Sequence, residues 1–336
     1  MFSKIYEWFI KFIKSNYKEI IFLIVFAFAM FYKFPYIVYK PGGAIDITPR
    51  ISVEGKDGIN GSYSMNYVSV SRGNIPNILL SYIIKDWQLE KEQNITIGDI
   101  DYDTSFKIEQ LEYKNAIFLA IYNACRINND CTINIDKEEV NVIAIDENAN
   151  TDLKLLDKII NVDGTDITDF RQIRNYVLSK KEGDIIHLKV LDNDREIDRT
   201  AVVYLRDGNP VIGISGYTTY EYTTDPVINI ATRNSEAGPS GGLMLSLALY
   251  DYLSDEDIAN GRKVMGTGTI DENGHIGPIG GIKYKMLGAK KGKADIFFSP
   301  MDNCEDALSI KKEYNIKYEV KCVETFSDAI NYLTSN

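Results

Sequence analysis

The sequence predicts a mixed α/β chain with a single N-terminal transmembrane helix and a small β-rich module inserted into an α/β body. Three observations lead to this fold class. A long apolar run lies near the N-terminus, within residues 20–39. Short apolar segments with strand or helix periodicity follow Pro41-Gly42-Gly43. Residues 140–205 form a strand, loop, helix and strand pattern of their own, with turn residues between the elements.

Length and charge limit the function classes. The chain has 336 residues, with 45% hydrophobic and 25% charged residues, which suits a folded protein of two domains plus an anchor. The formal net charge is −11, yet residues 1–40 carry six lysines against two glutamates. A basic leader therefore precedes an acidic body. Such a body is a poor partner for nucleic acid, and we expect none.

The N-terminal region predicts a membrane anchor. Residues 20–32 contain no charge, and residues 34–39 continue the apolar run after Lys33, giving about 20 residues, the length needed to cross a bilayer. Residues 1–19 form an amphipathic, lysine-rich leader, which the positive-inside rule places in the cytoplasm. The prediction is a single-pass protein of the cell membrane with the body that follows residue 40 extracytoplasmic. A signal peptide cleaved near Ala27-Phe28-Ala29 and a buried core helix are the less favoured alternatives.

The four cysteines form no metal-binding pattern. No C-x-x-C occurs, and only His187 and His275 are available as imidazole ligands, so we expect neither a metal nor another cofactor. In an extracytoplasmic body, Cys125 with Cys131 and Cys304 with Cys322 would form disulfides. Four unpaired thiols are an equal alternative at this point.

Residues 138–207 resemble a bacterial PDZ domain. The run Asp157 to Gly164 (DKIINVDG) carries the resemblance, and a helix near Phe170 to Ser179 follows it. The sequence departs from the family pattern at Leu156, where a glycine is usual. The resemblance implies capture of a peptide as an added strand at a sheet edge. A spacer without any ligand is the alternative.

The segment EAGPSGG at residues 236–242 directly precedes the apolar helical run 243–253. Glycine and proline predict a sharp turn, which places Ser240 at a helix N-terminus, where backbone N–H groups and the helix dipole stabilise negative charge. A serine that attacks a carbonyl needs such donors for the oxyanion, and we expect the backbone N–H groups around Gly238 to Gly241 to supply them. The small neighbours Gly238 and Gly241 allow a substrate backbone to approach. The alternative is an ordinary serine N-cap.

A serine nucleophile also requires a base, and a lysine is the better candidate than either histidine. At 100° per residue, Lys285 shares an apolar stripe with Ile282, Met286 and Ala289, whereas Lys283 points toward solvent. Burial lowers the pKa of an amine, so a lysine in an apolar stripe can be neutral at the working pH.

Four segments together resemble the proteolytic domain of Lon: GPSGG around Ser240, TGTI from Thr267, PIGGIKYK ending at Lys285, and FSPMDNC at 298–304. The resemblance implies a Ser240–Lys285 dyad in which Thr267 hydrogen-bonds the lysine. It also implies that residues 44–137 and 208–336 form the two parts of the Lon-like domain, with the PDZ-like module between them.

With the anchor, the chain resembles membrane-anchored, PDZ-containing Lon-like serine peptidases of the pheromone-processing type. That resemblance implies peptide or unfolded protein substrates, among them secreted signalling peptides, and a homo-oligomer. Lon has an acidic residue where this chain has Ala237, and Glu236 lies one position away. No G-x-x-x-x-G-K-[ST] motif occurs, so we expect an endopeptidase that works without ATP. The alternative is a catalytically silent PDZ scaffold that presents substrates to another protease.

Overall fold

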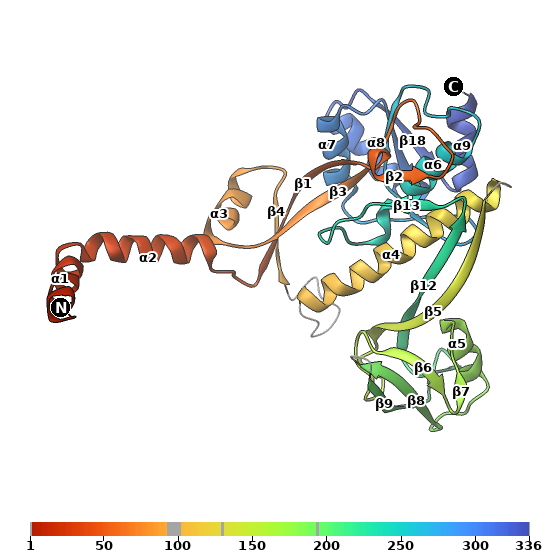
Figure 1. The fold of residues 1–336 in the computed structure, drawn as a ribbon, viewed down its shortest axis with the longest axis horizontal. Coiled ribbons are helices and arrows are strands. Elements are labelled where there is room, and N and C mark those ends of the chain that lie inside the picture. The colour runs from red at the N-terminus through yellow and green to blue at the C-terminus, as the bar shows by residue number, and fades with distance from the viewer. Residues whose placement is uncertain (1, 93–101, 129–130, 193–194, 336) are drawn as a thin grey trace. The chain divides into compact units, whose positions relative to one another are not determined.

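The computed structural model describes residues 2–92, 102–128, 131–192 and 195–335 (Figure 1). Short stretches of the predicted domains, at 93–101, 129–130, 193–194 and 336, lie outside the described residues. The chain divides into two compact units, one from Met1–Pro41 and Val68–Asp99, the other from Gly42–Tyr67 and Ile100–Asn336. Strands β1 (Tyr36–Asp46) and β3 (Ser62–Arg72) each run from one unit into the other.

The first unit contains three helices and a short strand among its described residues: α1 (Phe2–Ser15), α2 (Tyr17–Phe31), α3 (Ile75–Ile83) and β4 (Gln88–Lys91). β4 pairs antiparallel with Tyr36–Tyr39 of β1. Asn74 caps α3, because its side-chain oxygen accepts a hydrogen bond from the Asn77 amide at 3.0 Å.

The predicted transmembrane span over residues 20–39 is wrong, and so is the single-pass localisation that depended on it. Among the described residues, none of the helices is long and apolar enough to span a bilayer. α2 has 15 residues, about 22 Å at the helical rise, whereas the hydrocarbon core is about 30 Å thick. The helix ends at Phe31 because Tyr32 is extended and Pro35 disfavours helical backbone before it. Residues 36–39 of the expected span belong to β1 instead.

The second unit is built on a sheet in the order β18-β17-β14-β3-β1. β14 pairs parallel with both β3 and β17, and β17 pairs parallel with β18. The sheet strands not yet given are β14 (Lys263–Gly266), β17 (Ile296–Pro300) and β18 (Glu319–Val323). The elements around the sheet are η1 (Thr48–Arg50), β2 (Ile51–Val53), α4 (Tyr102–Ile127), β13 (Ile228–Ile230), η3 (Pro239–Gly241), α6 (Gly242–Leu253), β15 (Thr269–Ile270), β16 (Ile276–Gly277), α7 (Ile282–Gly292), η4 (Met301–Asn303), α8 (Cys304–Glu313) and α9 (Phe326–Ser335).

Both faces of this sheet are buried. Neighbouring residues of a strand point to opposite faces. Accordingly, Val264 and Phe298 belong to the core formed with α4, α6 and α9. Met265 and Phe297 belong to the core formed with α7 and α8. Helices cover both sides, as expected for a parallel sheet made of almost continuous apolar runs.

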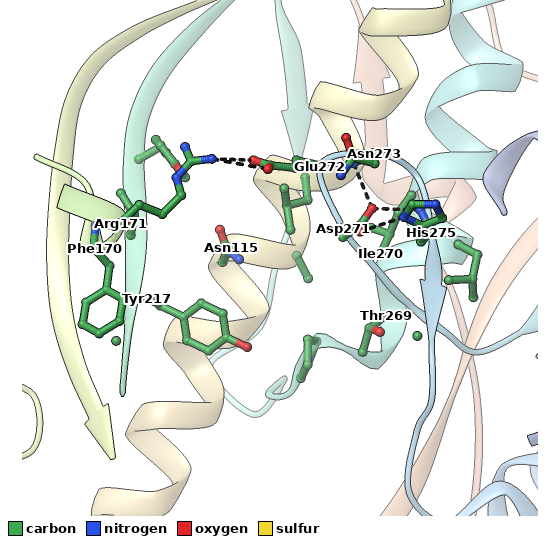
Figure 2. A pocket seen from close by; sticks show the side chains of 18 of the residues that line it. Asn115, Phe170, Arg171, Tyr217, Thr269, Ile270, Asp271, Glu272, Asn273 and His275 are labelled. Carbon is green, nitrogen blue, oxygen red and sulfur yellow. Dashed lines mark hydrogen bonds and ion pairs between the residues drawn. The ribbon is translucent and has the colours of Figure 1, made fainter. Parts of the chain in front are cut away.

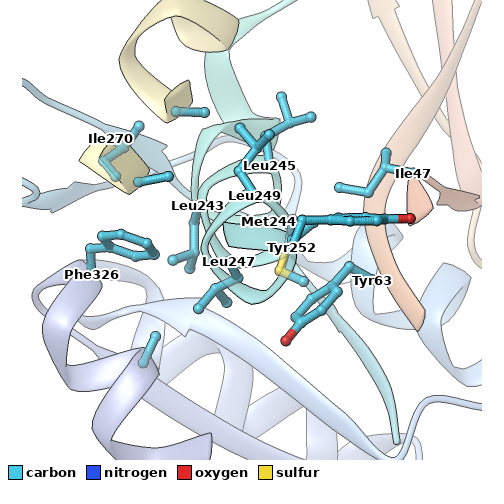
Figure 3. Close-up of a cluster of buried hydrophobic side chains, with 14 of the residues drawn as sticks. Ile47, Tyr63, Leu243, Met244, Leu245, Leu247, Leu249, Tyr252, Ile270 and Phe326 are labelled. Carbon is cyan, nitrogen blue, oxygen red and sulfur yellow. The ribbon is translucent and has the colours of Figure 1, made fainter. Parts of the chain in front are cut away.

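Helix α6 passes through the middle of the larger core (Figure 3). All its residues from Leu243 to Leu249 are fully buried, and Ile47, Tyr63, Ile270 and Phe326 surround it. This explains why the helix lacks an amphipathic pattern: it has no solvent face to keep polar. The predicted helix after the glycine-rich turn is confirmed, and its burial makes the N-terminal turn a rigid platform.

The strands between Thr132 and Asp225 form a second sheet in the order β12-β5-β6-β8-β9, with β7 paired to β6. Its elements are β5 (Thr132–Ile145), β6 (Lys158–Val162), β7 (Thr165–Asp166), α5 (Phe170–Leu178), β8 (Ile185–Asp192), β9 (Arg195–Val202), β10 (Tyr204–Arg206), β11 (Asn209–Val211) and β12 (Ile214–Asp225). A capping box of Asp169 and Gln172 starts α5. Leu156 has φ +71°, a left-handed conformation that explains why glycine is usual at this position.

The structure pairs all four cysteines, Cys125 with Cys131 and Cys304 with Cys322. Of the two alternatives that the sequence left open, it therefore contains the disulfides rather than free thiols. The second disulfide joins the start of α8 to β18.

Candidate active site

Ser240 lies at the centre of the short helix η3, two residues before α6 begins. Gly238 enters this turn with φ +84°, which a residue with a side chain rarely adopts. Ser240 itself is partly exposed, while the α6 residues after it are buried. The serine is therefore reachable from outside, at the positive end of a buried helix.

Thr267 and Gly268 hold the Ser240 turn in place. Both donate to the Ser240 carbonyl oxygen, Thr267 through its Oγ1 at 3.0 Å and Gly268 through its amide at 2.8 Å. A methyl group at Gly268 would lie 2.7 Å from Ile276, so only glycine permits this approach. Thr267 follows strand β14 directly, at its carboxyl end, and is fully buried.

Lys285 is a buried amine. It lies on α7 with 5% of its surface exposed, and its Nζ donates to Thr267 Oγ1 at 3.1 Å. No carboxylate of the described residues forms an ion pair with it. Burial lowers the pKa of Lys285 from 10.5 to about 8, because desolvation penalises the charged ammonium. Lys283, two residues away, is half-buried, and its Nζ lies 5.5 Å from the ring centre of Tyr314.

Thr267 thus links the two residues predicted to do chemistry. Its hydroxyl gives its one hydrogen to the Ser240 carbonyl and accepts one from Lys285. Among the described residues, no direct hydrogen bond joins Ser240 Oγ to Lys285 Nζ. Catalytic hydrogen bonds are often long without substrate and tighten when it binds.

Glu236 has a structural partner set that the sequence did not reveal. The buried carboxylate forms an ion pair with Arg50 of η1 and accepts a hydrogen bond from Tyr113 of α4 at 3.2 Å and from the Arg233 amide at 3.0 Å. It therefore anchors the segment before the serine turn and is not directed to Lys285. No local pattern predicts this pairing, because Arg50 lies 186 residues away in the sequence.

The two supporting glycines contribute to the serine turn in different ways. The Gly238 amide donates to the Glu109 carbonyl at 2.8 Å, so it is not available to an oxyanion. The expectation that it supplies a donor is therefore wrong, and its contribution is the left-handed turn. Gly241 is buried, and a methyl group there would lie 2.7 Å from the Met65 sulfur.

The histidines form no nucleophile–base pair with Ser240 in the described part of the chain. His187 lies in β8 of the second sheet. His275 Nδ1 lies 3.1 Å from Asp271, and both side chains line a cavity that Pro239 also borders (Figure 2). No hydrogen bond joins His275 to the serine among these residues.

Part of the chain is similar to known proteins. Residues 201–335 match the model of the Lon protease (S16) C-terminal proteolytic domain. This region of the chain is therefore similar to a Lon-type proteolytic domain. Together with relatives that are named Lon, this domain supports a serine peptidase, a hydrolase of peptide bonds.

The matched relatives are much longer than the matched region. Lon protease of Campylobacter jejuni is 36% identical over 96 residues, 28% of this chain and 12% of that protein. Lon protease of Heliobacterium modesticaldum is 27% identical over 157 residues, 46% of this chain and 18% of that protein. The Lon-like match thus spans less than a fifth of either relative.

Solved structures similar to part of the chain include the PDZ domain of an SdrC-like protein from Listeria innocua. It is 24% identical, and the match covers 24% of this chain and 93% of that domain, with a TM-score of 0.22. A TM-score this low assigns no fold to residues 138–207.

Proposed function

We propose that the chain is an ATP-independent serine endopeptidase in which Ser240 is the nucleophile and Lys285 the general base. The observation that supports it best is the chain of contacts from the Lys285 amine through the Thr267 hydroxyl to the Ser240 carbonyl. Burial of an amine that lowers its pKa to about 8 destabilises the fold. Groups whose pKa values are shifted in this way gather at active sites. Peptides and unfolded protein segments are the proposed substrates.

The proposed reaction begins with neutral Lys285. Its Nζ lone pair takes the Ser240 proton while one of its N–H groups stays on Thr267, and Ser240 Oγ bonds to the scissile carbonyl carbon. The Ser240 amide, at the start of a buried helix, is the proposed oxyanion donor. The lysine ammonium then protonates the leaving amine as the C–N bond breaks. Water attacks the acyl-enzyme, with Lys285 again as base, and releases the acid and free Ser240.

Two further assignments belong to this proposal. Residues 44–137 and 208–336 would form the Lon-like domain, with residues 138–207 as a PDZ-like module between them. The sequence contains no phosphate-binding loop, which supports hydrolysis without ATP within this chain.

The test is a cleavage assay with the full chain, using casein and a mixed peptide library without ATP. The panel is wild type, Ser240→Ala, Lys285→Ala, Lys283→Ala and His275→Ala. We expect the first two substitutions to abolish cleavage and the last two to retain it, because Lys283 and His275 have other partners.

Each other pattern has a definite meaning. If cleavage were lost in His275→Ala but kept in Lys285→Ala and Lys283→Ala, the general base would be His275, paired with Asp271, and not a lysine. Unchanged cleavage with Ser240→Ala would refute the nucleophile. A wild-type chain that binds peptides and cleaves none of them would favour the silent scaffold.

A further inference from the structure

A cavity of about 870 Å³ lies beside the serine turn and has no role in the chemistry described so far (Figure 2). Its volume is in the range of ligand-binding cavities. Pro239, the neighbour of Ser240, borders it, as does Thr269, two residues after Thr267. α4, the start of α5, strand β12, the β15–β16 turn and η4 provide the remaining walls. A peptide held at Ser240 would therefore extend into this space.

The basic side chains in this cavity already have acidic partners. Arg171 is its only lysine or arginine among the described residues, and it pairs with Asp169 at 2.8 Å and with Glu272 at 3.3 Å. His275 is paired with Asp271. These contacts leave no excess positive charge at the walls.

Two further carboxylates of the lining have no ion pair among the described residues. Asp302, on η4, and Glu324, just after β18, are both exposed. They belong to adjoining segments, because the Glu324 carbonyl accepts a hydrogen bond from the Ile276 amide of β16, and η4 contacts both β16 and β18. The part of the cavity wall formed by η4 and the end of β18 therefore carries two carboxylates without an ion pair among the described residues.

Aromatic residues form another part of the cavity wall. Phe170, Tyr217 and Tyr220 line it, and Tyr217 is drawn with its hydroxyl directed into the open space (Figure 2). No hydrogen-bond partner for this hydroxyl is present among the described residues. An aromatic face attracts a cation, and a phenol oxygen accepts a hydrogen bond from one.

We propose that this cavity is a specificity subsite that binds a lysine or arginine side chain of the peptide substrate near the scissile bond. The alkyl stem would lie against the aromatic wall, and the charged end would reach Asp302, Glu324 and the Tyr217 hydroxyl. This inference rests on the proposed function, because it assigns a substrate class to the same active site.

The test compares fluorogenic peptides that differ only in one residue, lysine, arginine, glutamine or glutamate, scanned along the positions around the cleaved bond. The full chain is assayed as wild type, Asp302→Asn, Glu324→Gln and Glu305→Gln. Glu305 lies three residues from Asp302 but outside the cavity lining, so its variant changes the net charge equally. Binding of the same peptides to Ser240→Ala, followed by fluorescence anisotropy, separates recognition from chemistry.

We expect wild type to prefer lysine and arginine at one position. Asp302→Asn and Glu324→Gln should each lower kcat/KM for those peptides roughly fivefold and leave the glutamine peptide unchanged. Glu305→Gln should change neither. Equal cleavage and equal binding of lysine and glutamine peptides would overturn this inference while leaving the peptidase intact. An equal effect of all three variants would also overturn the inference. It would show that the negative charge of the protein as a whole, and not the cavity, favours the basic peptides. Charge-selective binding without cleavage by wild type would refute the peptidase and leave the subsite.

Discussion

Replacing Lys285 by methionine should abolish cleavage and at the same time stabilise the fold. The pKa of Lys285 falls from 10.5 to about 8 on burial, and each pKa unit corresponds to about 1.4 kcal/mol. The buried ammonium therefore costs the folded state about 3 kcal/mol at neutral pH. The substitution loses one hydrogen bond of about 1 kcal/mol, yet Thr267 keeps its bond to the Ser240 carbonyl. The expected net gain is about 2 kcal/mol, or roughly 3 °C in Tm for a chain of this length.

The gain should depend on pH in a defined direction. The folded pKa lies below the unfolded one, so the unfolded chain binds more protons between about pH 8 and 10.5, and wild-type stability rises with pH there. The difference in Tm between Lys285→Met and wild type should therefore be largest below pH 8 and shrink toward pH 10. Urea unfolding and thermal melts from pH 6 to 10 measure it. Lys283→Met is the matched control on the same helix and should show no such gain. Two results would contradict a destabilising burial of the Lys285 ammonium. One is a Lys285→Met protein less stable than wild type at pH 7, and the other is a difference in Tm that does not vary with pH.

Three further changes test other parts of the site. Thr267→Val should lower kcat roughly tenfold or more with little change in KM, and Thr267→Ser should restore most of it; equal activity of both would remove Thr267 from the mechanism. Glu236→Ala leaves the Arg50 guanidinium without its partner and should destabilise the fold by about 3 kcal/mol in urea unfolding; a change near zero would contradict the anchoring role. The double substitution of Cys304 and Cys322 by serine removes an 18-residue crosslink and should cost about 3 kcal/mol; a melt that matches oxidised wild type would count against it.

Local patterns predicted the core of the site well. The turn around Ser240 and the helix after it follow from glycine and proline before an apolar run, and the structure has both. The burial of Lys285 follows from counting 100° per residue along one helix, because its neighbours Ile282 and Met286 are core residues. Both inferences use short-range periodicity, which the backbone geometry imposes directly.

The length of helix α2 and the contacts between residues far apart in sequence could not be predicted from local patterns. The anchor prediction counted apolar residues over 20–39 but underestimated Pro35, which helps end helical backbone early. The side-chain partners of Glu236 come from η1 and α4, more than 100 residues away in sequence. The amide of Gly238 was expected to face an oxyanion, yet it is taken by a carbonyl of α4, which only the tertiary packing determines.

The most direct measurement is the rate of acyl-enzyme formation at Ser240 as a function of pH. An activated peptide ester is mixed with the enzyme, and the modified residue is identified by mass spectrometry of the quenched protein. We expect acylation of Ser240 at a rate that rises through about pH 8 and is lost in Lys285→Ala. Acylation of another residue, or a Ser240 rate that is the same from pH 6 to 10 and survives Lys285→Ala, would contradict it.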